Sequence, residues 1–302
     1  MRLDQYLTAQ NWASRSQITK WIRAGFVRVN GKTVKSSRLV GPSDKIEVHP
    51  PSATEPELKP EKIALTILYE DKHLIVVNKA AAMVVHPGAG HWKGTLAAAL
   101  LAHCKDLSGI GGVKRPGIVH RLDKGTSGVI VAAKNDKTHT FLSDQFKNHE
   151  VTKIYWALVY GKMKTEKGTF DSFLTRSPAH RQKFMVHVSK GKRAVTHYKV
   201  LKEGEGVSLL EIRLETGRTH QIRAHLTEAG HSILGDPLYG GHSRRLKFIQ
   251  NEKLRAFLQG LDHTLLHAHT LGLMHPVTGK KMKWTAPLPV DFKKAIALSF
   301  PQ

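Results

Sequence analysis

The sequence predicts an α+β protein with a small N-terminal domain and a larger second domain. A chain of 302 residues corresponds to about two domains, and 40% hydrophobic residues can supply a sizeable core. Residues 49–62 contain four prolines, which cannot continue a helix or a central strand. Short apolar runs typical of strands alternate with capped helical segments on both sides. We therefore expect one domain over 1–48, a semi-rigid linker over 49–62 and a second domain over 63–302.

The charge balance indicates a polyanionic partner. Lysine and arginine number 47 against 24 acidic residues, a net charge of +23, which favours nucleic acid. The alternative is a basic protein that is merely soluble. No run of 18 apolar residues suits a membrane span, and the N-terminus lacks a signal-peptide core, so we expect no membrane partner. Cys104 is the single cysteine, which excludes an internal disulfide and fits the reducing cytoplasm.

The first domain begins with a capped basic helix. Ser14 and Gln17 form a capping-box pattern that opens a helix over 15–24, and Gly25 ends it. The apolar stripe consists of Ile18, Trp21 and Ile22. Two short strands, 27–29 and 32–34, then flank Asn30-Gly31, a dipeptide typical of tight hairpins, and a third short strand covers 46–48.

The second domain opens with a strand pair, over 65–69 and 73–77. Its most polar loop is 120–128, which lies between apolar runs at 117–119 and 129–133. We expect both runs to be strands, so that Asp123 lies on a loop between them. The alternative role for Asp123 is to cap a turn through the amides that follow it.

Further along, Asp136 suits a helix cap for a helix through His149, and strands are expected over 153–161 and 210–214. The basic stretches 181–186 and 191–198 suit a hairpin or an exposed charged loop. Thr219 is the expected N-cap of a helix that ends at Gly230. On that helix His220 and Arg223 share one face.

Other site classes fit the sequence poorly. His267 and His269 could suggest a metal, but the further ligands that a zinc site needs do not accompany them. The segment 125–128 is not the Gly-x-Ser-x-Gly elbow of serine hydrolases. The chain also has no glycine-rich phosphate loop. We therefore expect no metal, because zinc ligands are too few, and no nucleotide cofactor, because a phosphate loop is absent.

Three segments carry a resemblance to a known family. Residues 120–128 resemble the HRLD-x-x-TSG motif of the RluA-type pseudouridine synthases. Residues 153–161 resemble the Lys-x-Tyr-x-Ala-Leu-Val-x-Gly motif of that family, and 214–226 resemble a second signature. The chain departs from the family at Ala80 and Ala82, where Pro and Gly are usual. The resemblance implies a mixed, mainly antiparallel catalytic domain that isomerises uridine in RNA to pseudouridine without a cofactor.

The resemblance also implies roles for single residues. Asp123 would be the nucleophile, Arg218 would pair with it and keep it ionised, and Tyr155 would stack on the base or relay a proton. Leu214 would pack near the base, and Arg121 would fill the gap left by the flipped nucleotide. The remaining residues expected to bind substrate are His120, Thr126, His220 and Arg223.

The first domain resembles the S4 RNA-binding domain. The matching segments are 2–4, 14–16, 25–31 and 43–46. The resemblance implies phosphate contacts, for which we select Arg2, Arg15, Lys20 and Arg23; the alternative is a solvated charged face.

Together the two resemblances point to a cytoplasmic monomer that modifies 23S ribosomal RNA of the large subunit or its precursor. The alternatives are a synthase for transfer RNA and a non-catalytic RNA-binding or ribosome-assembly factor.

Overall fold

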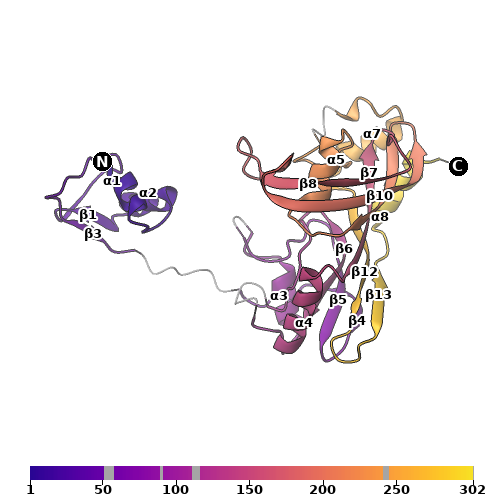
Figure 1. The fold of residues 1–302 in the computed structure, drawn as a ribbon, viewed down its shortest axis with the longest axis horizontal. Coiled ribbons are helices and arrows are strands. Elements are labelled where there is room, and N and C mark those ends of the chain that lie inside the picture. The colour runs from indigo at the N-terminus through magenta and orange to yellow at the C-terminus, as the bar shows by residue number, and fades with distance from the viewer. Residues whose placement is uncertain (51–57, 89–90, 111–115, 241–244, 302) are drawn as a thin grey trace. The chain divides into compact units, whose positions relative to one another are not determined.

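The protein, seen in a computed structural model, forms two compact units, Met1–Glu57 and Leu58–Gln302 (Figure 1). The structure describes residues 1–50, 58–88, 91–110, 116–240 and 245–301. Part of the predicted linker, 51–57, lies outside the described residues. Its predicted end at residue 62 differs from the structure, because Leu58 is buried in a core of the second unit. Among the described helices, none has the length and apolar character needed to cross a membrane.

The first unit packs two helices on a three-stranded sheet. Its elements are α1 (Leu3–Ala9), α2 (Arg15–Arg23), β1 (Val27–Val29), β2 (Lys32–Thr33) and β3 (Ile46–Val48), with strand order β2-β1-β3. The Ser14 hydroxyl accepts a hydrogen bond from the Gln17 amide, as the capping pattern predicts. Asn30 and Gly31 both have positive φ, 52° and 74°, as a tight hairpin requires. Sequence analysis missed α1.

A buried carboxylate orients two of the arginines expected to contact RNA. The Asp4 side chain is 4% exposed and lies 3.1 Å from Arg2 Nε and 2.8 Å from Arg15 Nε. Both arginines therefore also hold the first unit together, because Asp4 would otherwise be an unpaired buried charge. Lys20 and Arg23 lie exposed on α2.

The second unit is built on one large sheet. Its elements are β4 (Thr66–Glu70), β5 (Leu74–Lys79), α3 (Leu96–His103), β6 (Ser127–Ala133), α4 (Asp136–Lys147), β7 (Thr152–Tyr160), β8 (Lys167–Arg176), β9 (Phe184–His187), β10 (Lys192–Gly204), β11 (Val207–Leu214), α5 (Gln221–Glu228), α7 (Glu252–Gln259), β12 (Leu266–Met274), β13 (Lys281–Thr285) and α8 (Val290–Ser299). The strand order is β4-β5-β6-β12-β7-β11-β10-β8-β9, and β13 pairs with β12. Only the β6–β12 pairing is parallel among the described strands, which confirms a mixed, mainly antiparallel sheet.

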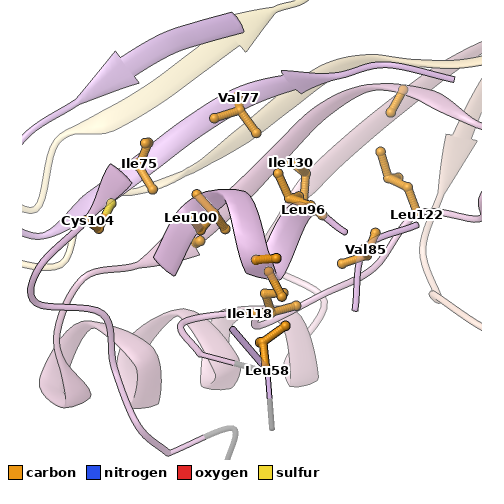
Figure 2. Close-up of a cluster of buried hydrophobic side chains, with 14 residues drawn as sticks. Leu58, Ile75, Val77, Val85, Leu96, Leu100, Cys104, Ile118, Leu122 and Ile130 are labelled. Carbon is orange, nitrogen blue, oxygen red and sulfur yellow. The ribbon is translucent and has the colours of Figure 1, made fainter. Parts of the chain in front are cut away.

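Side chains on both faces of this sheet are buried. On β5, Ile75 and Val77 pack in the core that contains α3 (Figure 2). The alternate residues Leu74 and Val76 pack in a second core with Leu142 of α4. Burial of both faces explains why β5 reads as a continuous apolar run.

Two local predictions were wrong. The run 117–119 forms a single bridge, Ile118 with Ala132, because Gly117 adopts a positive φ of 69° and leaves the strand path. The helix cap of α4 is Asn135, whose side chain accepts the Thr138 amide hydrogen bond. The Asp136 carboxylate instead accepts hydrogen bonds from the Ser108 hydroxyl and the Gly109 amide.

Candidate active site

Asp123 lies on the loop that enters β6, as the sequence predicts. The Asp123 carbonyl accepts the Thr126 amide hydrogen bond at 3.0 Å, which closes a tight turn. Leu122 and Thr126 are buried on either side of it. A Cβ atom at Gly128 would lie 2.2 Å from the Ala268 carbonyl oxygen, so only glycine lets β6 approach β12 here. The turn is thus anchored in the core while the Asp123 side chain is 18% exposed.

Arg223 holds the Asp123 carboxylate. Its Nη1 donates to Asp123 Oδ2 at 3.0 Å, while Nε and Nη2 donate to the two oxygens of Asp236 at 2.7 and 2.9 Å. Asp236 is fully buried and also accepts the amides of Leu238 and Tyr239. The guanidinium lies over the Tyr239 ring, 4.8 Å from its centroid. Although burial opposes ionisation, the two carboxylates raise the pKa of Arg223, so it stays charged.

The expected pairing of Arg218 with Asp123 was wrong. Arg218 is exposed, and its Nε donates to the Arg193 carbonyl at 3.1 Å. Its backbone amide donates to Gln221 Oε1. Arg223 pairs with Asp123 in place of Arg218 because of where α5 begins. Arg223 projects from the first turn of α5 toward Asp123, whereas Arg218 lies on the loop before the helix. Arg218 still lines the cavity beside Tyr155.

Helix α5 begins differently from the prediction. Its N-cap is His220, in a left-handed conformation with φ of 57°, and not Thr219. His220 Nδ1 lies 3.1 Å from the Tyr239 hydroxyl, and its Nε2 lies 3.8 Å from Asp123 Oδ2. Burial lowers the pKa of His220, although the Asp123 charge opposes the shift. His220 and Arg223 both lie beside Asp123, although His220 caps α5 and is not part of its helical face.

Tyr155 and Leu214 line the cavity beside Asp123. Tyr155 comes from β7 and packs between two cores, and Leu214 ends β11. The cavity around Asp123, with a volume of about 90 Å³, opens next to a second of about 490 Å³, and both residues line both cavities. Burial raises the pKa of Tyr155, and the nearby Asp123 charge adds to the rise. The phenol is therefore protonated at neutral pH, which suits stacking better than proton abstraction.

The other residues predicted on the Asp123 loop lie at different places around the two cavities. Arg121 is exposed at the rim and lines both cavities, and Thr126 lines the smaller one. His120 faces the larger cavity, but its Nε2 accepts the Val131 amide at 3.1 Å and its ring stacks on Phe146. Burial lowers the pKa of His120 to about 3, with the Lys153 charge adding to the shift. His120 thus anchors the loop to β6 more than it contacts the Asp123 pocket.

Three supporting residues had no role in the sequence analysis. Lys79 is 1% exposed, and its ammonium donates to the carbonyls of Ala80, Met83 and Lys124 at 2.8, 2.7 and 3.4 Å. It thereby ties the loop after β5 to the turn that carries Asp123. Burial lowers the pKa of Lys79 to about 7, opposed by Asp123.

The other two are Gln221 and Asp236. Gln221 bridges the loop before α5 to β10 through the Val195 carbonyl and the Thr196 hydroxyl. Nothing in the sequence spacing around Asp236 indicates that this carboxylate bonds Arg223.

Candidate metal ligands in the described residues have other partners. His267 bonds Ser127 through Nδ1 and the Ala286 carbonyl through Nε2. Glu70, His103 and Cys104 bring three ligand atoms together. However, Lys134 donates to Glu70 at 3.0 Å, and burial raises the pKa of the Cys104 thiol to about 11. A protonated thiol and a carboxylate already paired with an ammonium fit a metal poorly.

Comparisons with known proteins identify families for both units. Residues 73–228 match the family model described as RNA pseudouridylate synthase, and residues 1–46 match the S4 domain. The chain is 43% identical to "Uncharacterized RNA pseudouridine synthase YlyB" of Bacillus subtilis, over 98% of this chain and 93% of that protein. It is 42% identical to "Ribosomal large subunit pseudouridine synthase D" of Pseudomonas aeruginosa, over 98% and 91%. The human protein "RNA Pseudouridylate Synthase Domain Containing 1" is a structural neighbour, with a TM-score of 0.59 and 26% identity over 76% of this chain and 85% of that one.

Proposed function

Because this chain belongs to the RNA pseudouridylate synthase family, we propose that it converts uridines of large-subunit ribosomal RNA to pseudouridine, with Asp123 as the nucleophile. In this isomerisation the N1–C1′ bond breaks, the uracil turns, and C5 bonds to C1′. The proton leaves C5, and N1 ends as an N–H group. The observation that carries the proposal is the Asp123 carboxylate, held by Arg223 at the cavity that Tyr155 lines.

Each neighbour of Asp123 has a distinct task in this proposal. The uracil must leave the stack to reach the cavity, at a cost of a few kcal/mol. Tyr155 then stacks on the flipped base, Leu214 packs at its edge, and Arg121 takes the place that the base vacates. Arg223 keeps the Asp123 carboxylate ionised and oriented, and Asp236 and Tyr239 fix Arg223.

The substrate class is supported by three observations. Relatives in Zymomonas mobilis and Pseudomonas aeruginosa carry the name "Ribosomal large subunit pseudouridine synthase D". The S4 domain and the net charge of +23 both suit a large, structured RNA. In this proposal the enzyme acts in the cytoplasm, where this RNA is found. It acts as a monomer, which size-exclusion chromatography tests.

The first experiment measures tritium release from C5-labelled uridine in unmodified large-subunit ribosomal RNA. We expect release by the wild type and none by Asp123→Asn, with RNA binding retained in both. Asp144→Asn, an exposed aspartate on α4, is the matched control and should keep full activity. Equal release by wild type and Asp123→Asn would rule out Asp123 as the nucleophile.

A parallel series with unmodified transfer RNA tests the substrate class. We expect release from ribosomal RNA at least tenfold faster. The reverse preference would contradict the ribosomal assignment and leave the reaction intact. No release by the wild type from either RNA would favour a binding factor that retains the fold.

A further inference from the structure

A basic pocket lies at the end of the sheet away from the active site. It opens between the tips of the β4–β5 and β12–β13 hairpins and has a volume of about 640 Å³. Its lining includes four lysines and two aromatic residues, which define the hairpin pocket: Lys72, Lys280, Lys281, Lys283, Tyr69 and Trp284. Figure 1 shows β4, β5 and β13 close together at one end of the second unit.

The topology of the sheet creates this pocket. Strand β12 pairs with β6 only at His267 and Ala268. From Thr270 onward β12 pairs with β13, while it also stays paired with β7 through Gly272. The β4–β5–β6 part of the sheet and the β12–β13 hairpin therefore diverge beyond this point. The gap between them is a feature of strand pairing and does not depend on a flexible loop.

The floor of the hairpin pocket is formed by two aromatic rings and a carboxylate with several hydrogen-bond donors. The Tyr69 and Trp284 rings lie 5.5 Å apart. Asp71, the acidic residue of the lining, accepts hydrogen bonds from the Tyr69 hydroxyl, His275 Nε2 and two backbone amides. Although burial opposes ionisation, these hydrogen bonds lower the pKa of Asp71 to about 2, so its charge is fixed and internally satisfied.

The four lysines at the rim lack such compensation. All are exposed, and across the described parts of the chain no carboxylate lies within ion-pair distance of their ammonium groups. Four like charges around one concave surface repel each other unless a polyanion binds there.

We propose that the hairpin pocket is a second contact site for the phosphate backbone of the substrate RNA. The inference rests on the RNA-modifying activity and goes beyond the proposed reaction. Strand β5 runs from this pocket to Lys79, which contacts the turn of Asp123, and its six residues cover roughly 17 Å. Each strand of a duplex carries one phosphate per roughly 3.4 Å of helix axis, so the contact lies on the order of five base-pair steps from the target uridine. The substrate RNA is the polyanion already bound at this distance, which favours it over an acidic protein.

The test compares two triple variants with equal loss of charge. Lys280, Lys281 and Lys283 are changed to Gln in one, and exposed Lys202, Lys253 and Lys293 in the control. RNA binding is measured against salt concentration with a long ribosomal transcript and with a short hairpin that ends within four steps of the target. Lys72→Gln, on the other hairpin, is the independent second variant.

We expect the pocket variant to reduce the salt slope for the long transcript by about 2 and to weaken binding about tenfold. The control variant and the short hairpin should show no such change, and the rate of tritium release at saturating RNA should stay that of the wild type. An unchanged slope, or an equal effect on both RNA lengths, would overturn the inference. Because binding is the deciding measurement, an RNA that binds without being modified would count against the proposed substrate and not against this pocket.

Discussion

At the scale of single residues, one guanidinium serves two carboxylates with different tasks. Asp236 is fully buried and takes one edge of Arg223, whereas Asp123 is 18% exposed and takes the remaining Nη1. The inner carboxylate fixes the plane of the guanidinium, and the outer one is thereby aimed at the cavity. Removing one partner of such a buried pair typically costs about 3–5 kcal/mol.

We therefore expect Arg223→Lys to lower the rate of tritium release about 100-fold, because an ammonium cannot hold both carboxylates in one plane. The free energy of unfolding should fall as well. Arg218→Lys is the matched control, since it keeps the charge and loses only the bond to the Arg193 carbonyl. Single-turnover tritium release and urea unfolding give both quantities. A larger loss with Arg218→Lys than with Arg223→Lys would restore Arg218 as the partner of the nucleophile.

At the scale of one element, the loop after β5 contains stored strain. Ala82 has a φ of 65°, a left-handed conformation, at the position where the resembled family usually has glycine. This conformation costs about 1–2 kcal/mol for a residue with a Cβ atom. Lys79 holds the loop in place by donating to the carbonyls of Ala80 and Met83.

We expect Ala82→Gly to raise the free energy of unfolding of the second unit by about 1 kcal/mol, because glycine adopts this conformation without strain. Ala81→Gly is the control; its backbone does not have a positive φ, so glycine there should be neutral or destabilising. Urea unfolding followed by tryptophan fluorescence measures both. A destabilised Ala82→Gly would show that the methyl group packs usefully.

At the scale of the whole molecule, buried neutral histidines link stability to pH. Burial lowers the pKa of His225 and of His267 to about 4, well below the ordinary value near 6.5. Between pH 6.5 and 4 the unfolded chain binds more protons at these two sites than the folded chain. Their contribution is therefore complete above pH 6.5 and is lost as the pH falls through 4.

The free energy of unfolding should be lower at pH 5.5 than at pH 7.5 by about 1 kcal/mol for each of these histidines. His225→Gln should remove its share of this difference and can still bond the Ser172 hydroxyl. Urea titrations of both proteins at the two pH values test this. Equal stability of the wild type at both values would show that these histidines are not buried in neutral form.

Local chemistry made much of the fold predictable. The Ser14 cap, the Asn30-Gly31 turn and the strand that follows Asp123 depend on neighbours within a few residues, and the structure agrees with them. The sequence predicts only a substrate-binding role for Arg223. Its pairing with Asp123 could not be predicted, because the two residues are 100 positions apart and the contact depends on where α5 begins. The left-handed His220 shifted that beginning past Thr219, and no propensity signals such a backbone.

The central position of β12 has a consequence for the timing of synthesis. This strand, Leu266–Met274, separates β6 from β7, which are made more than a hundred residues earlier. A chain emerging from the ribosome must keep the two earlier strands unjoined until β12 arrives, and contacts of such long range form slowly. Asp123 on the β6 side and Tyr155 on β7 can therefore come together only when the chain is nearly complete. While the chain is still being synthesised, the active site is not yet assembled. The incomplete enzyme therefore cannot modify the RNA of the ribosome that makes it.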